Sequence, residues 1–254
     1  MPRFASVAAL TLAVLVSAPA CGGRNEPEPE LVGAGGVRQS VTCTGTGSPA
    51  VVMIHGIGDR ANSGNLAEAQ RVLSGKHRTC RYDRPGTGRS PDPARAGRTA
   101  EDLVSELAAV ADHADPAAPV ILVAHSFGGY PALLFADRHP DRVAGMVLAD
   151  TVDPGQGLLA ALGVRTWQDV RQGREGLDLE AVEREVAGTG PLGGLPLVVL
   201  RRGEGVGEPW LEAQRALAAR SSRSRLLVAE GSGHEVPAED PGAVGDAVAA
   251  LSGL

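Results

Sequence analysis

The stretch Val120-Ile-Leu-Val-Ala-His-Ser-Phe-Gly-Gly129 decides how this chain folds. Its apolar start, Val120–Ala124, is typical of a buried strand, and the helical pattern Phe127–His139 follows almost at once. Ser126 therefore occupies a sharp corner between a strand and a helix. The residues two positions before and two after the serine are alanine and glycine, and only small side chains avoid the neighbouring backbone at such a corner. The stretch predicts a serine hydroxyl that projects above the carboxyl edge of a sheet.

The remaining chain continues this alternation of strand and helix. Strand-like runs are Val37–Thr42, Val51–His55, Thr79–Asp83, Val143–Ala149, Leu197–Leu200 and Leu226–Ala229, and helical patterns are Asn62–Ser74, Thr99–His113, Pro209–Ser221 and Ala243–Leu251. Alternation of this kind predicts an α/β fold, with a mostly parallel central sheet and helices on both faces. Residues 151–195 interrupt the rhythm with two weak helical patches, Gly163–Gln172 and Asp178–Ala187, and are expected to form a small cap insertion.

Composition excludes several classes of protein. The chain has 254 residues, enough for one α/β domain, and its net charge is −6. Seven aromatic residues and an acidic balance argue against a nucleic-acid-binding protein. Three cysteines alone make neither a dense disulfide scaffold nor a four-ligand zinc site, so no metal is expected.

The N-terminus has the pattern of an export signal. An uncharged stretch follows Arg3 and ends in Ala18-Pro19-Ala20, which predicts a signal peptide over residues 1–20. Cys21 comes next and resembles the lipidated cysteine of bacterial lipoproteins, although Ala18 stands where that motif usually has Leu or Val. Simple secretion is the alternative. Residues 21–36 are polar and Pro-rich at first and are expected to be a disordered tether, with the folded domain over residues 37–254.

Export also affects the two remaining cysteines. Cys43 and Cys80 both lie in predicted strand regions, and an exported protein meets an oxidising compartment. A disulfide between them is therefore expected, and two buried thiols are the alternative.

Three motifs in order resemble the α/β-hydrolase family, and exported actinobacterial hydrolases in particular. They are the serine corner, the run Val51-Val-Met-Ile-His-Gly-Ile-Gly58 and the turn Asp83-Arg-Pro-Gly-Thr-Gly-Arg-Ser90. The likeness covers nearly all of residues 37–254, and the serine corner departs from G-x-S-x-G by Ala at the first position. The resemblance implies that Ser126 is a nucleophile and that the backbone N–H groups of Ile57 and Phe127 form an oxyanion hole.

The resemblance also implies a general base and an acid. Among six histidines, His234 alone follows the last predicted strand and precedes the last helix, where this family places its base. In this family the acid usually follows the strand that corresponds to Leu197–Leu200. Here the only carboxylates in the segment after that strand are Glu204 and Glu208. Asp150, at the end of the preceding strand, is the favoured acid, and the two glutamates are the alternatives.

These residues predict an exported serine hydrolase that cleaves an acyl bond, above all a carboxylic ester, with no cofactor. Asp at the nucleophile position would indicate an epoxide hydrolase or a dehalogenase, and this chain has Ser. Peptidase, thioesterase or acyltransferase activity on the same residues stays open, as does a non-catalytic ligand-binding module. The expected partners are a small substrate with an apolar portion and, through Cys21, a membrane. The oligomeric state and the substrate are not predicted.

Overall fold

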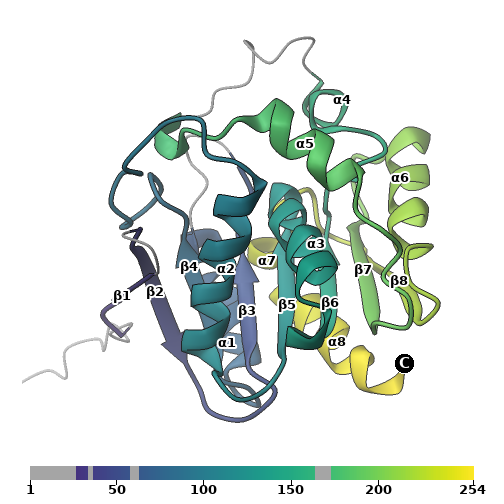
Figure 1. Ribbon diagram of the computed structural model, residues 1–254. Helices are drawn as coiled ribbons and strands as arrows, with labels where there is room; N and C mark the ends of the chain where they lie inside the picture. The colour runs from purple at the N-terminus through teal and green to yellow at the C-terminus, as the bar shows by residue number, and fades with distance from the viewer. Residues whose placement is uncertain (1–26, 34–36, 58–62, 164–172) are drawn as a thin grey trace, which may run out of the picture.

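In a computed structural model of the protein, the described residues are 27–33, 37–57, 63–163 and 173–254. The strands are β1 (Glu30–Val32), β2 (Gln39–Thr44), β3 (Val51–Ile54), β4 (Thr79–Asp83), β5 (Val120–His125), β6 (Val143–Ala149), β7 (Leu197–Arg202) and β8 (Ser224–Ala229). Within the described chain they form one eight-stranded sheet in the order β1-β2-β4-β3-β5-β6-β7-β8 (Figure 1). β1 pairs with β2, and β2 pairs with β4, in antiparallel fashion at one edge. Every other pair of neighbouring strands in this order is parallel.

Helices cover both faces of the sheet, as the alternation predicts. The main ones are α1 (Ala67–Leu73), α2 (Ala100–Ala114), α3 (Gly129–Arg138), α6 (Glu208–Ala218) and α8 (Pro241–Ala250), and the short α7 (Val236–Glu239) precedes α8. Helices α2, α3 and α6 pack on one face, and α1 and α8 pack on the other (Figure 1). The predicted α/β fold class is confirmed.

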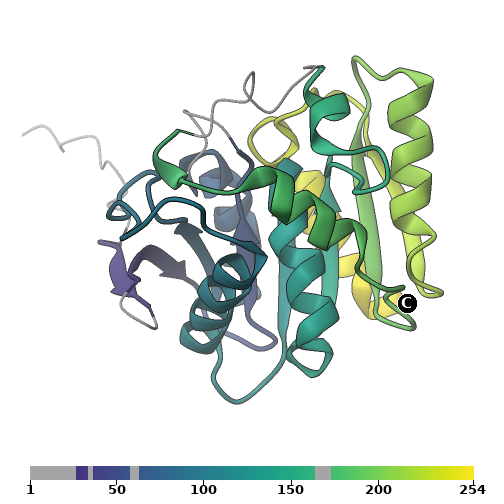
Figure 2. The same ribbon diagram turned by 45° about the horizontal axis from the view of Figure 1, so that its top comes forward.

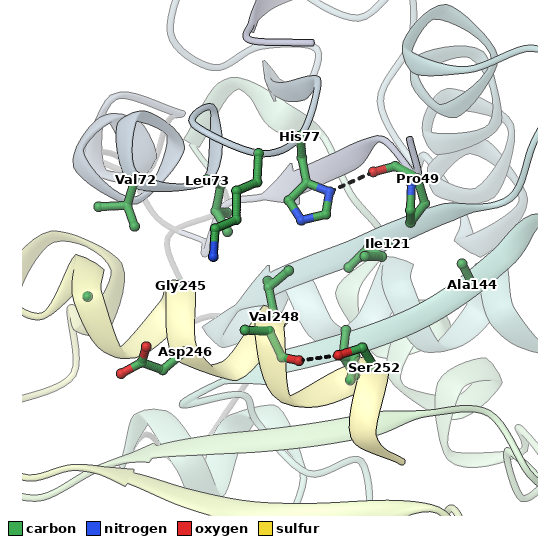
Figure 3. A pocket seen from close by; sticks show the side chains of 14 residues that line it. Pro49, Val72, Leu73, His77, Ile121, Ala144, Gly245, Asp246, Val248 and Ser252 are labelled. Atoms are coloured by element: carbon green, nitrogen blue, oxygen red, sulfur yellow. Dashed lines mark hydrogen bonds between the residues drawn. The ribbon is translucent and has the colours of Figure 1, made fainter. Parts of the chain in front are cut away.

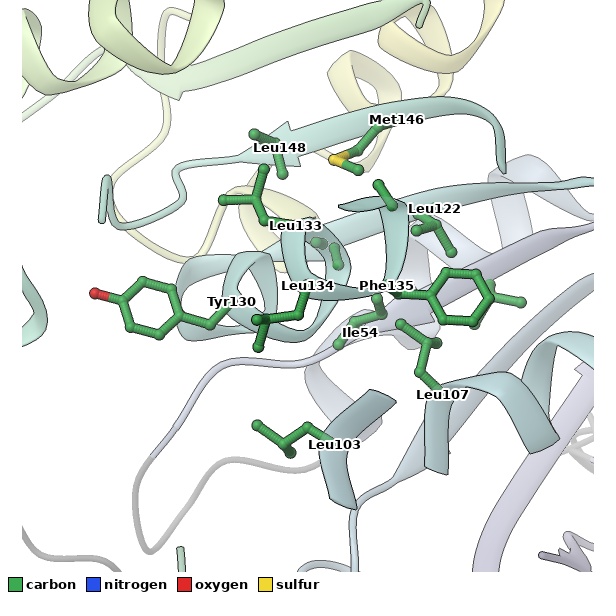
Figure 4. Packing of buried hydrophobic residues seen from close by; sticks show 14 of the residues in the cluster. Ile54, Leu103, Leu107, Leu122, Tyr130, Leu133, Leu134, Phe135, Met146 and Leu148 are labelled. Carbon is green, nitrogen blue, oxygen red and sulfur yellow. The ribbon is translucent and has the colours of Figure 1, made fainter. Parts of the chain in front are cut away.

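The two cores result from the alternation of side chains along each strand. In β3, Val52 and Ile54 enter the core beneath α2 and α3, whereas Val51 and Met53 enter the core beneath α1 and α8. Figure 4 shows the first core, where Leu133 and Phe135 of α3 lie among side chains from the sheet and from α2. Because both of their faces are buried, the central strands β3, β5 and β6 are almost continuously apolar.

The insertion over residues 151–195 contributes three described elements. They are α4 (Leu158–Leu162), the 3₁₀ turn η5 (Gly173–Glu175) and α5 (Leu179–Ala187). Figure 2 shows α5 crossing above α3, and the hydroxyl of Tyr130 in α3 donates to Glu183 in α5 at 3.2 Å. The helical patch predicted at Gly163–Gln172 lies outside the described residues except for Gly163, which ends α4 in a left-handed conformation.

The expectation of a disordered tether over residues 21–36 is wrong at Glu30–Val32. These residues form β1 because the outer edge of β2 offers unpaired backbone groups that another strand can bond. On the other side of β2, Cys43 and Cys80 face each other across the β2–β4 pair and form the expected disulfide.

The predicted signal peptide (residues 1–20) and Cys21 lie outside the described residues. None of the helices in the described part of the chain combines the length and apolarity needed to span a bilayer.

Candidate functional site

The predicted site residues meet at the carboxyl edge of the sheet. Ile57 lies in the loop after β3, Ser126 follows β5, Asp150 follows β6, and His234 lies in the loop after β8. β3 lies between β4 and β5, so the strand order reverses there. In open α/β sheets, the crevice outside such a reversal is where ligands bind.

Ser126 occupies the expected corner, and its backbone is strained. Its φ is 55° and that of Asp150 is 45°, and these are the non-glycine residues with positive φ among those described. Such a conformation costs about 1–3 kcal/mol and persists only where the surroundings impose it. Here the corner packs directly on the end of β3, because a Cβ added to Gly128 would lie 2.5 Å from the carbonyl oxygen of Ile54. The small residue in this position is therefore required by contact with the neighbouring strand.

His234 connects the serine to the aspartate. Its Nε2 lies 3.0 Å from Ser126 Oγ, and its Nδ1 lies 2.6 Å from Asp150 Oδ2. Since a carboxylate accepts, Nδ1 carries a proton, and Nε2 of the neutral ring is free to accept the serine proton. His125 holds this loop in place, because its Nε2–H donates to the carbonyl oxygen of His234 at 2.8 Å.

Asp150 is fully buried and accepts hydrogen bonds on both oxygens. Oδ1 accepts from the indole Nε1–H of Trp210 at 2.8 Å and from the backbone N–H of Arg202 at 3.2 Å. Oδ2 accepts from His234 and from Arg202 Nη1, the latter at 2.6 Å. Burial alone would raise the pKa of Asp150, but the hydrogen bonds and charges of His234 and Arg202 outweigh it and hold that pKa below its usual value.

Arg202 and Trp210 contact the acid, and neither was among the predicted site residues. Arg202 is the last residue of β7 and thus ends at the same edge as Asp150, and its guanidinium lies 4.5 Å from the centre of the Trp210 ring. The position of Arg202 at a strand end was a usable signal, whereas nothing local links Trp210 to an aspartate 60 residues away.

The two alternative acids point elsewhere. Glu204 is exposed, and Glu208 pairs with Arg215 at 2.7 Å. The structure brings together Ser126, His234 and Asp150 rather than a set that contains either glutamate.

The loop after β3 closes the site from the other side. A Cβ added to Gly56 would lie 3.5 Å from Ser126 Oγ, so this backbone runs directly beside the hydroxyl. Ile57 follows Gly56, and Phe127 follows the serine. The role of their backbone N–H groups as oxyanion donors stays a prediction.

Two other features bear on ligands. His125, His234 and Glu235 offer ligand atoms within 4.8 Å of one another, but both ring nitrogens of His234 already face Ser126 and Asp150, so a metal would have to displace them.

A cleft of about 620 Å³ lies between α1 and α8, lined by residues such as Val72, Ile121 and Val248 (Figure 3). The three residues brought together at the sheet edge do not line it.

Comparisons with known proteins agree with this architecture. The profile of the alpha/beta hydrolase fold matches residues 49–184, more than half of the chain. A 2-hydroxy-6-oxo-2,4-heptadienoate hydrolase of Pseudomonas putida is 34% identical over 123 residues, which cover 48% of this chain and 44% of that protein. The Bacillus subtilis protein YqjL is 28% identical over 63% of this chain and 67% of its own length.

Solved structures share the fold at low sequence identity. A thermophilic esterase from Thermogutta terrifontis superposes with a TM-score of 0.64 at 21% identity, covering 89% of this chain and 97% of the esterase. A serine hydrolase from Cycloclasticus zankles gives a TM-score of 0.69 at 17% identity, covering 89% and 98% of the two chains. Together with the profile match and the sheet order, these findings show that the chain belongs to the alpha/beta hydrolase fold family.

Proposed function

We propose that this hydrolase is an exported serine esterase, in which Ser126 is the nucleophile, His234 the general base and Asp150 the acid. The observation that carries the proposal is the continuous hydrogen-bonded series from Ser126 Oγ through His234 to Asp150, with distances of 3.0 and 2.6 Å. The strained backbone at the two ends of this series supports it, because strain of this kind concentrates at functional sites.

The geometry supports acyl transfer through a covalent intermediate. Ser126 Oγ attacks the ester carbonyl while its proton moves to His234 Nε2, and Asp150 stabilises the resulting imidazolium. The N–H groups of Ile57 and Phe127 hold the oxyanion. The tetrahedral intermediate collapses and releases the alcohol, which takes the proton from His234. Water then gives a proton to His234 and attacks the acyl-enzyme, and the carboxylic acid leaves as Ser126 regains its proton.

The names of the relatives support hydrolysis but not one substrate. Esterase and meta-cleavage product hydrolase are names of other proteins with this fold, and esters, amides and thioesters can all be processed by the same three residues. Export and lipidation of Cys21 are part of the proposal. The disulfide between Cys43 and Cys80 supports an oxidising compartment.

A fluorophosphonate probe and a panel of p-nitrophenyl esters of increasing chain length test the catalytic part. We expect wild-type protein to be labelled and to hydrolyse the esters faster than an aminopeptidase substrate. Ser126→Ala and His234→Ala should lose both properties, whereas His139→Ala, which changes an exposed histidine at the end of α3, should keep them. A folded wild-type protein that the probe does not label would refute the proposal of an enzyme and favour a non-catalytic ligand-binding module.

Export is tested separately in cells. An alkyne analogue of palmitate should label the wild-type protein in the membrane fraction, and Cys21→Ser should abolish that labelling. Unlabelled protein in the medium would indicate simple secretion instead.

A further inference from the structure

We propose that Arg84, paired with Glu175 of the cap insertion, is a positioning residue that orients the oxyanion-binding peptide between Gly56 and Ile57. This inference rests on the proposed function, because it concerns the donor that would hold the oxyanion. It gives the insertion a role in the chemical step in addition to covering the site.

Arg84 is fully buried and donates hydrogen bonds to two carbonyl oxygens of the loop after β3. Its Nη1 donates to the carbonyl of His55 at 2.7 Å, and its Nη2 donates to the carbonyl of Gly56 at 2.5 Å. The Gly56 carbonyl and the N–H of Ile57 belong to one planar peptide, so a constraint on the oxygen also constrains the direction of the N–H.

The same carbonyl receives a second donor. The Nδ1–H of His55 lies 2.9 Å from the oxygen of Gly56, while His55 Nε2 accepts from the backbone N–H of Arg84 at 3.3 Å. Burial first, and the charge of Arg84 second, lower the pKa of His55, so the ring stays neutral and keeps this arrangement of donor and acceptor. A cationic donor on the carbonyl side also polarises the peptide and strengthens its N–H as a donor.

The guanidinium also touches the residue that bears the other expected donor. The Arg84 Cζ lies 5.4 Å from the centre of the Phe127 ring. One buried cation thus contacts both sides of the expected oxyanion hole.

Among the described residues, Glu175 is the only charged side chain in direct contact with Arg84. It is buried and binds in a forked manner, with Oε2 at 2.7 Å from Nε and Oε1 at 3.1 Å from Nη2. The segment is held there because Arg98 Nη1 donates to the carbonyl of Glu175 at 2.7 Å. The Asp83–Ser90 turn also packs against it, since a Cβ on Gly86 would lie 2.3 Å from the Arg174 carbonyl. A buried arginine without its carboxylate is strongly unfavourable, so the position of Arg84 depends on the cap insertion.

A control variant elsewhere in the fold separates a purely stabilising role of the ion pair from the positioning role. Arg84→Met/Glu175→Leu removes both charges together and so avoids an unpaired buried ion. Val248 of α8 is buried in the core on the other face of the sheet. Val248→Ala leaves a cavity there and is the control for loosening of the fold.

The readouts are kcat and KM on p-nitrophenyl acetate, the inhibition constant of a trifluoromethyl ketone that forms an oxyanion on the serine, and Tm. We expect the double variant to lose about 10- to 100-fold in kcat at unchanged KM, somewhat less than removal of a whole oxyanion donor. Its ketone affinity should weaken by a similar factor. Val248→Ala should lower Tm and keep kcat and the ketone affinity.

A folded double variant with kcat within about twofold of wild type would overturn the inference, as would an equal loss of kcat in Val248→Ala. If the double variant does not fold, Glu175→Gln measures the same effect with Arg84 intact, and an unchanged kcat there overturns the inference equally. A wild-type protein without esterase activity refutes the proposed function itself, so the two failures are distinct.

Discussion

Asp150→Asn should abolish most of the activity because the surroundings dictate how the introduced amide must sit. The Oδ1 position receives two groups that can only donate, the indole N–H of Trp210 and the backbone N–H of Arg202. The amide oxygen is therefore forced to stay there, and the NH₂ group takes the Oδ2 position opposite His234 Nδ1. His234 must then accept at Nδ1 and carry its proton on Nε2, where it can no longer take the proton of Ser126.

The expected size of this effect is large. In serine proteases the loss of the correct tautomer costs about 10⁴-fold in kcat, which corresponds to about 5.5 kcal/mol in the activation free energy. Here the NH₂ group would also lie at the present 2.6 Å from Arg202 Nη1, so one hydrogen bond to a charged group is lost, worth about 1.5–3 kcal/mol of stability. We therefore expect a kcat reduced by about 10³- to 10⁴-fold, together with a lower Tm.

The assay is steady-state hydrolysis of p-nitrophenyl acetate at a temperature well below the Tm of the variant. Glu204→Gln and Glu208→Gln are the matched controls, because each makes the same carboxylate-to-amide change, in the loop after β7 and at the start of α6, and both should keep wild-type rates. A folded Asp150→Asn protein within tenfold of wild type would refute the tautomer argument. A large loss in either control would transfer the role of the acid to that glutamate.

Three further predictions concern pH and stability. Hydrogen bonds hold the pKa of Asp150 in the folded protein below its ordinary value, so its ionised form stabilises the fold fully above about pH 4 and progressively less as the pH falls through that lowered pKa. Calorimetry should show the difference in Tm between wild type and Asp150→Asn narrowing from about pH 6 to about pH 3. A difference in Tm that does not change with pH contradicts this. Gly128→Ala should lose about 1–3 kcal/mol in urea unfolding because the new Cβ meets backbone at 2.5 Å, while Gly231→Ala, with open space around it, should change little. Cys43→Ser/Cys80→Ser should lose about 3–4 kcal/mol from opening a loop with a sequence separation of 37, and a reductant should lower the stability of wild type but not of this variant.

Much of the fold could be read from the sequence because its signals are local. The strand over residues 120–125, the corner at Ser126 and the helix after it follow from consecutive apolar, small and helix-forming residues. The edge strand β1 was missed because its polar segment pairs only through backbone groups that β2 happens to leave open. The cap insertion was predicted only roughly, since its helices depend on contacts such as that between Tyr130 and Glu183.

By itself, the sequence determined the mostly parallel sheet, the strand-to-helix corner and the loop that contains His234, because these depend on residues adjacent in the chain. It left the acid open among Asp150, Glu204 and Glu208. Only the tertiary structure brought Asp150 to 2.6 Å from His234 and surrounded it with Arg202 and Trp210, and only the folded chain placed Glu175 on Arg84. These partners lie 52 to 91 positions apart, and such contacts are decided by which strand ends and loops converge at one edge of the sheet.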